Sequence, residues 1–162
     1  MNLRNLLAAA VVVASALCAG GARAQMPNPY GPLISLENAK KAAAAAQAEA
    51  RKNNWTMAVA VVGPGGILVY FEKADGTQNG SAQVAIDKSR TSALFKRPSK
   101  ALQDAVAAGA EGLRLLKLEG ATPIEGGMPL LIDGKIVGAI GVSGGTSAQD
   151  GQCARAGADL FK

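Results

Sequence analysis

The chain contains no histidine among its 162 residues. Histidine is the usual general base near neutral pH and the commonest protein ligand of zinc and haem iron. Its absence excludes a Ser-His-Asp hydrolase, a histidine-ligated zinc enzyme and a histidine-ligated haem. Cysteine is almost as scarce, because Cys18 and Cys153 are the two in the chain. A cysteine-rich zinc site is therefore excluded too.

Charge and long apolar runs are also in short supply. The formal net charge is +5 and the basic residues are dispersed, which argues against nucleic-acid binding. The apolar run from Leu6 to Leu17 is shorter than the roughly 20 residues that a membrane-spanning helix needs. We therefore predict no nucleic-acid partner and no membrane span.

The first residues have the layout of a secretion signal peptide, residues 1–24. A positive start precedes the apolar run, and Ala22-Arg23-Ala24 offers a cleavage site of small residues. We predict cleavage after Ala24 and a periplasmic or secreted protein. Cys18 would leave with the signal, so the remaining Cys153 has no partner for an internal disulfide and is expected to be buried.

After cleavage, residues 25–32 hold three prolines and predict a flexible or extended arm. Residues 33–162 have the length of one domain. The pattern inside it predicts helices, two hairpins and a last helix. The helical segments run from Ser35 to about Asn53, Ser81 to Leu94, Ser99 to Ala107 and Ala148 to Phe161, and Ser35 and Ser99 are predicted to cap theirs. The strand-like runs are 56–62 and 67–72, and Glu111 to Leu118 is a helical turn or a short strand.

The most informative stretch is 126–145, which reads as one hairpin. Apolar runs flank Asp133-Gly134, a dipeptide that readily takes the positive φ angles of a two-residue turn. Gly138 and Gly141 in the second run predict a central strand crossed closely by another backbone or a ligand. Thr146 or Ser147 can then cap the last helix, and Ser147-x-x-Asp150 has the form of a capping box. The fold class is α+β.

The same stretch carries a resemblance to a known family. Gly126 to Leu130, Asp133 to Gly145, Ala85 to Ala93 and Phe95 to Ser99 together resemble the GlcG/HbpS-like haem-binding family, over roughly residues 33–161. The resemblance implies a profilin-like antiparallel sheet of about five strands flanked by helices. It also implies a homo-oligomer and a haem ligand.

Two segments offer candidate ligand contacts. Residues 141–145 match the G-x-S-x-G nucleophile motif, but without a histidine base a plain strand-to-helix turn is favoured over a serine nucleophile with a lysine base. The turn can instead present Ser143 and Gly144 to a propionate or carboxylate, unless it only caps its own helix. Lys88, Arg90, Lys96 and Arg97 form the densest basic cluster, with the charged side chains of helix 81–94 expected to project away from its apolar face.

The resemblance associates this basic segment with haem. The predicted cofactor-binding residues are Lys88, Thr91, Lys96, Arg97, Met128, Ser143 and Gly144. Thr91 is the predicted iron ligand, and Tyr30, Tyr70, Met57, Met128, Cys153 or a lysine are alternatives. Met128 and Tyr70 are better explained as packing residues, since a lone Met or Tyr beside a strand is more often core than ligand.

Three functions remain open on this basis. The first is an exported, oligomeric haem-binding or haem-sequestering protein without turnover of its own. The second is an enzyme or accessory protein of a catabolic pathway that binds a small carboxylate between Gly126-Gly127 and Ser143. The third is a purely structural oligomer, which the absence of a pocket near Thr91 and Ser143 would support.

Overall fold

The computed structural model describes residues 27–161. The predicted signal peptide, residues 1–24, and the first two residues of the predicted arm lie outside this range. The helices and strands follow the predicted order, and the 111–118 segment is a 3-10 helix, η1. They are α2 (Leu36–Lys52), β1 (Ala58–Val62), β2 (Leu68–Lys73), α3 (Ser81–Leu94), α4 (Ser99–Ala107), η1 (Ala110–Lys117), β3 (Gly127–Ile132), β4 (Lys135–Ser143) and α5 (Ser147–Ala158).

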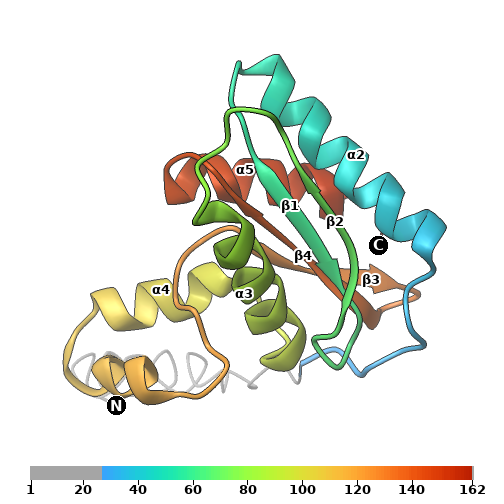
Figure 1. Cartoon of the computed structure of the whole chain (residues 1–162). Helices are drawn as coiled ribbons and strands as arrows, with labels where there is room; N and C mark the ends of the chain where they lie inside the picture. Colours follow the sequence, from blue (N-terminus) through green and yellow to red (C-terminus); the bar gives the residue numbers. More distant parts are fainter. Residues whose placement is uncertain (1–26, 162) are drawn as a thin grey trace, which may run out of the picture.

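The strands form one antiparallel sheet in the order β2-β1-β4-β3 (Figure 1). Each hairpin contributes one edge strand and one central strand. The α+β fold class is confirmed, with four strands among the described residues where about five were expected. Every residue of the central strand β1 is buried, as a strand flanked on both sides requires.

The β3–β4 hairpin turns where predicted. Asp133 and Gly134 have φ angles of 50° and 69°, and Ile132 pairs with Lys135 across the turn. Positive φ at both central residues is the requirement of the tight turn that suits twisted strands. The sequence signal and the observed geometry are therefore the same.

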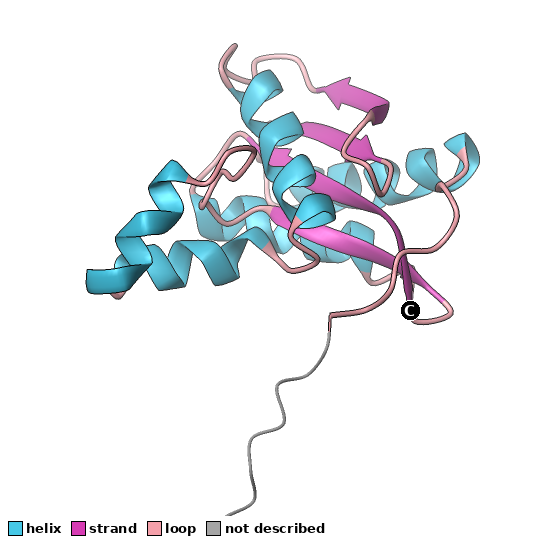
Figure 2. Cartoon of the chain, turned by 90° about the horizontal axis from the view of Figure 1, so that it is seen from below, coloured by secondary structure: helices cyan, strands magenta, loops and turns pink. Residues whose placement is uncertain are grey.

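Helices cover both faces of the sheet. Helix α3 lies against β4, β1 and β3 on one face, and α2 packs beside α5 on the other (Figures 1 and 2). A Cβ at Gly141 of β4 would overlap the backbone oxygen of Ala85 in α3. The predicted close crossing is therefore confirmed, and it is α3 that crosses. On the opposite face Gly157 of α5 lies against Ala42 of α2.

The helix starts agree with the sequence in part. Ser35 caps α2, accepting a hydrogen bond from the Asn38 N–H at 3.2 Å. For α5 the capping box consists of Thr146 and Gln149. The predicted box of Ser147 and Asp150 is wrong, because the Asp150 side chain points into the interior.

Ser99 was also predicted to be a cap, and this too is wrong. Its hydroxyl donates to the Ile124 oxygen at 2.6 Å and accepts from the Gly127 N–H at 2.9 Å. Pro98 stands in the cap position of α4 instead. Ser99 thus ties the chain entering β3 to the start of α4.

The described part of the predicted arm lies along β4. The Gly31 N–H donates to Ile136, and the Ile136 N–H donates to Pro29, both at 2.8 Å. This pairing fixes Tyr30 beside the end of α3. Within residues 27–161 no helix is both long enough and apolar enough to cross a membrane.

Candidate functional site

A buried ion pair joins the two helical layers. Lys88 of α3 and Asp150 of α5 are 1% and 2% exposed, and the Lys88 Nζ lies 2.6 Å from the Asp150 Oδ2. The same ammonium donates to the Val142 oxygen at 3.2 Å, and the Asp150 Oδ1 accepts from the Gly145 N–H at 3.0 Å. Burying two charges costs several kcal/mol each unless their hydrogen bonds are met, as they are here.

Gly126, in the loop before β3, covers the Lys88–Asp150 ion pair. A Cβ at this position would lie 2.7 Å from the Val142 oxygen and 2.9 Å from both the Asp150 Cβ and the Lys88 Nζ. The φ of Gly126 is +130°, which other residues rarely adopt. Glycine therefore lets the chain lie directly over the ion pair as it enters β3.

Burial determines the direction in which the pKa of Asp150 is shifted. It raises the pKa of the Asp150 carboxyl, although the Lys88 ammonium and the backbone N–H groups of Gly145 and Gly144 act in the lowering direction. Asp150 is thus held in the interior by partners that favour its charged form, against a desolvation penalty that is larger. Such an opposition is frequent at functional sites and also occurs in structural ion pairs.

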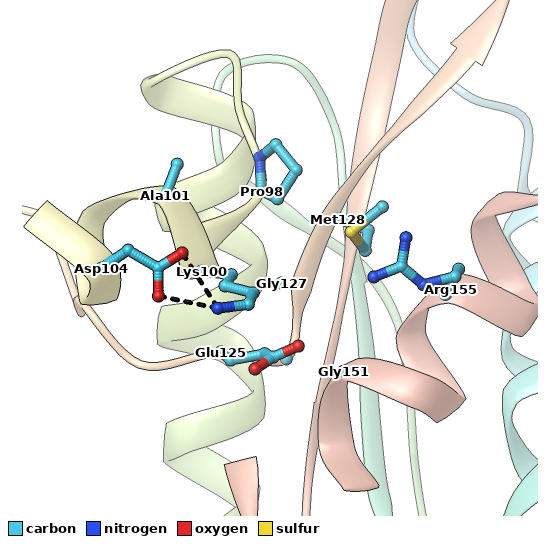
Figure 3. A pocket seen from close by; sticks show the side chains of 10 residues that line it. Pro98, Lys100, Ala101, Asp104, Glu125, Gly127, Met128, Gly151 and Arg155 are labelled. Atoms are coloured by element: carbon cyan, nitrogen blue, oxygen red, sulfur yellow. Dashed lines mark hydrogen bonds and ion pairs between the residues drawn. The ribbon is translucent and has the colours of Figure 1, made fainter. Parts of the chain in front are cut away.

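A pocket of about 210 Å³ opens beside Gly126 and Gly127 (Figure 3). It lies between α4, the start of β3 and α5. Its lining residues are Pro98, Lys100, Ala101, Asp104, Glu125, Gly126, Gly127, Met128, Gly151 and Arg155. Drug-sized ligands occupy roughly 300–1,000 Å³, so this pocket suits a smaller molecule.

A second feature, the α3-end face, consists of Tyr30, Arg90, Leu94, Lys96 and Arg97. The Tyr30 hydroxyl donates to the backbone oxygens of Ala93 and Leu94 at 2.9 and 3.2 Å, and the Lys96 Nζ lies 4.1 Å from the centre of the tyrosine ring. Leu94 is exposed, and none of the three cations has an acidic partner within 4.0 Å in residues 27–161. The face therefore combines an apolar side chain with unpaired positive charge.

The predicted site residues are divided between these features. Lys96 and Arg97 lie on the α3-end face, and Met128 lines the pocket. Lys88 does not project from α3 as expected but is buried in the ion pair. It cannot reach a surface ligand from that position.

The other three predicted residues are engaged within the protein. The Thr91 hydroxyl is buried, donates to the Asp87 oxygen at 2.7 Å and accepts from the Thr122 N–H at 2.8 Å. Ser143 is buried with its hydroxyl 3.3 Å from that of Ser81, and Gly144 packs against Met57. The structure therefore does not bring Ser143 or Gly144 into the pocket. No group of three or more acidic, cysteine or histidine side chains within 27–161 is arranged to hold a metal ion.

Comparison with known proteins identifies the family. The family described as haem degrading protein HbpS-like matches residues 34–159. The chain belongs to this HbpS-like family. The predicted resemblance to the GlcG/HbpS group is thereby confirmed.

Individual members support the same assignment. Protein GlcG of Escherichia coli K12 is 40% identical over 111 residues, covering 68% of this chain and 81% of GlcG. The crystal structure of a double mutant of Streptomyces reticuli HbpS superposes with a TM-score of 0.74 at 31% identity, covering 90% of this chain and 94% of HbpS. The structure of a PduOC–haem complex has a TM-score of 0.72 at 24% identity, over 80% of this chain and 96% of that one, and shows the shared fold.

Sequence reasoning missed three residues that shape the HbpS-like domain of this chain. Asp150 was given only a capping role, and Glu125 and Arg155 were not singled out. A signal for the ion pair was present in the helix spacing. Lys88 follows Ala85 by three residues and precedes Ser92 by four, and Asp150 precedes Cys153 and Ala154 by three and four. Each charge therefore lies within the buried stripe of its own helix.

Proposed function

We propose that the protein is an exported haem-binding or haem-sequestering protein and that the α3-end face holds the haem. Membership of the HbpS-like family supports the ligand, and one observation supports the place: the Lys96 ammonium lies over the exposed Tyr30 ring, whose hydroxyl bonds to the backbone of the exposed Leu94. Haem presents a flat apolar ring and two propionates. Such a ligand requires apolar contact together with charge-assisted hydrogen bonds.

The donor groups of the chain fit haem through an oxygen ligand. Tyr30 is 42% exposed at this face, and tyrosine is an established ligand of haem iron. Both hydroxyls are hydrogen-bonded within the protein, but Thr91 is 0% exposed, whereas Tyr30 could exchange its bonds to the Ala93 and Leu94 oxygens for the iron at the surface. We therefore favour Tyr30 over Thr91 as the ligand, with Arg90, Lys96 and Arg97 pairing the propionates. Bound haem would supply the iron for any redox chemistry, and these residues would bind and orient it.

Haemin titration followed by the Soret band tests this assignment. We expect saturable binding with the spectrum of a high-spin, oxygen-ligated iron, since no histidine is present. Tyr30→Phe should change the spectrum, because it removes the ligand oxygen. Arg97→Gln should weaken binding about ten- to a hundredfold while leaving the spectrum unchanged, since it removes a propionate contact.

Two further variants make the test specific. Arg51→Gln, at the exposed end of α2, is the matched control and should bind haemin as the parent protein does. Thr91→Val distinguishes the two candidate ligands. If Thr91→Val changed the spectrum and Tyr30→Phe did not, Thr91 would be the iron ligand. Absence of any saturable change with haemin would refute the haem proposal.

Export and assembly belong to the same proposal. The N-terminal pattern supports cleavage after Ala24, and the intact mass of the protein recovered from the cell envelope or medium tests it, with retention of Met1 as the contrary result. The exposed leucines Leu113, Leu116 and Leu118 support a homo-oligomer. Light scattering at micromolar concentration would contradict that assembly if it gave a monomer mass.

The alternative function, an accessory protein that binds a small molecule through its carboxylate, is supported by Arg155 in the pocket beside Gly126. Haem cannot enter a pocket of about 210 Å³, so the two ligands would occupy different places. Titrations with haemin and with small acids therefore report on separate residues.

A further inference from the structure

In the pocket beside Gly126, two opposite charges, those of Glu125 and Arg155, lie along one face of helix α5. Arg155 and Gly151 of α5 both line it, and they are one helical turn apart. The Glu125 carboxylate lies against Gly151, so closely that a Cβ there would overlap it. Positions four apart on a helix are about 5–6 Å from each other, which places the Glu125 carboxylate about one turn from the base of the Arg155 side chain.

Neither charge forms an ion pair among the described residues. In residues 27–161 Glu125 has no basic partner within 4.0 Å and Arg155 has no acidic one. Of the remaining charges at the pocket, Lys100 pairs with Asp104 at 2.7 Å and is also attracted electrostatically by Glu125. The pocket thus offers one positive and one negative group outside any ion pair, and its four charges sum to zero.

The floor adds an unused donor. Gly126 is buried, lines the pocket, and its backbone N–H donates to no acceptor within the part of the chain that the structure describes. Buried backbone N–H groups are almost always paired with protein, water or ligand. The position of Gly126 is fixed from behind by Val142, Lys88 and Asp150, so this floor is rigid.

The other walls are apolar. Pro98, Ala101 and Met128 contribute apolar side chains to the lining (Figure 3). At roughly 30 Å³ for each water molecule in the liquid, the cavity of about 210 Å³ holds a ligand of about seven heavy atoms.

We propose that this pocket binds a small zwitterion, an α-amino acid of three or four carbons. Its carboxylate pairs with Arg155, whose planar guanidinium suits bidentate contact, and the Gly126 N–H is available as a further donor. Its ammonium pairs with Glu125, and its short side chain contacts Pro98, Ala101 and Met128. A neutral ligand matches a pocket of no net charge, whereas a simple carboxylate would leave Glu125 facing another anion.

Titration of the ¹⁵N-labelled full chain with L-alanine, followed by NMR, tests the proposal. We expect saturable shifts of the Gly126 and Gly127 amide signals. L-lactate replaces the ammonium by a hydroxyl and isopropylamine lacks the carboxylate, so both should bind at least tenfold more weakly than alanine.

Two pocket variants and one control separate recognition from folding. Arg155→Gln and Glu125→Gln should each weaken alanine binding about ten- to a hundredfold. Glu125→Gln should in addition bind lactate more tightly than the parent protein does, because the repulsion between carboxylates is gone. A loss of structure would not produce that reversal. Arg51→Gln should leave all three ligands unaffected.

Three results would overturn the proposal. They are no saturable shift at Gly126 and Gly127 with millimolar alanine, equal alanine affinity in both pocket variants and the parent, or lactate binding as tightly as alanine. The haem proposal stands apart from these outcomes, because Arg155→Gln is expected to titrate with haemin unchanged.

Discussion

Replacing Lys88 by methionine removes the positive half of the buried ion pair while keeping most of the side-chain volume. Asp150 would then remain 2% exposed, with the backbone N–H groups of Gly145, at 3.0 Å, and Gly144 as its remaining donors. Leaving one member of a buried pair uncompensated typically costs 3–5 kcal/mol. We expect the lower end, about 3 kcal/mol, because Asp150 keeps these hydrogen bonds and can take up a proton. For a domain of this size the melting temperature should fall by about 10 °C.

Equilibrium unfolding in urea measures the effect, and a double-mutant cycle isolates the pair. Asp150→Asn alone leaves the Lys88 ammonium buried without a counter-charge, while the double variant carries no uncompensated charge. The double variant should therefore lose less free energy of unfolding than the two single losses summed. Lys41→Met is the matched control, because its exposed pair with Glu37 has the same 2.6 Å separation and should not change stability measurably. Additive losses, or a Lys88→Met loss as small as the control's, would refute the reasoning.

The pH dependence of the same variants gives an independent check. Burial raises the pKa of Asp150 from its ordinary 3.8, so the native state binds this proton more tightly than the unfolded chain. The resulting stabilisation of the native state is fully present below pH 3.8 and is lost as the pH rises through the raised pKa of Asp150. The stability advantage of the parent protein over Asp150→Asn should therefore fall with rising pH across that window. An advantage that instead grew with pH would show that Lys88 dominates desolvation.

The remaining predictions concern local structure. Thr146→Ala should lower the free energy of unfolding by about 1 kcal/mol because it removes the α5 cap, whereas Ser147→Ala should have little effect, and chemical denaturation compares them. Gly141→Ala should destabilise by about 1–3 kcal/mol or prevent folding, because its Cβ would overlap the Ala85 oxygen, and circular dichroism melting measures it. Burial raises the pKa of Cys153 to about 12, so mass spectrometry of thiol alkylation at pH 8 should show its peptide unmodified until the protein is unfolded.

The fold was largely predictable because its signals are local. Asp133-Gly134 determined a turn, and Gly141 indicated a close crossing, which is α3 in the structure. Caps were less predictable, since Ser99 and Ser147 have the right chemistry at the start of a helix. Tertiary contacts decide which of several neighbouring hydroxyls or carboxylates caps a helix. Ser99, for example, bonds to Ile124 and Gly127 instead.

The site was predicted less well because it depends on residues distant in the chain. Lys88 was grouped with exposed cations from its sequence neighbours, although its partner lies 62 residues away on the opposite face of the sheet. Glu125 and Arg155 line the same pocket only because α5 returns beside the start of β3. Charge composition does not reveal such a pairing, whereas a charged residue inside a buried helical stripe does point to one.

The position of the ion pair connects the core to the proposed ligand pocket. Lys88 comes from one helical layer and Asp150 from the other, and they meet where Gly126 leads into β3, next to Val142. One side of Gly126 rests on the pair, and the residue also lines the pocket. Because the pair is hydrogen-bonded at both ends, it holds this backbone in place before any ligand arrives. A preformed floor reduces the entropy lost on binding, so disruption of the pair should weaken the alanine affinity even in a variant that still folds.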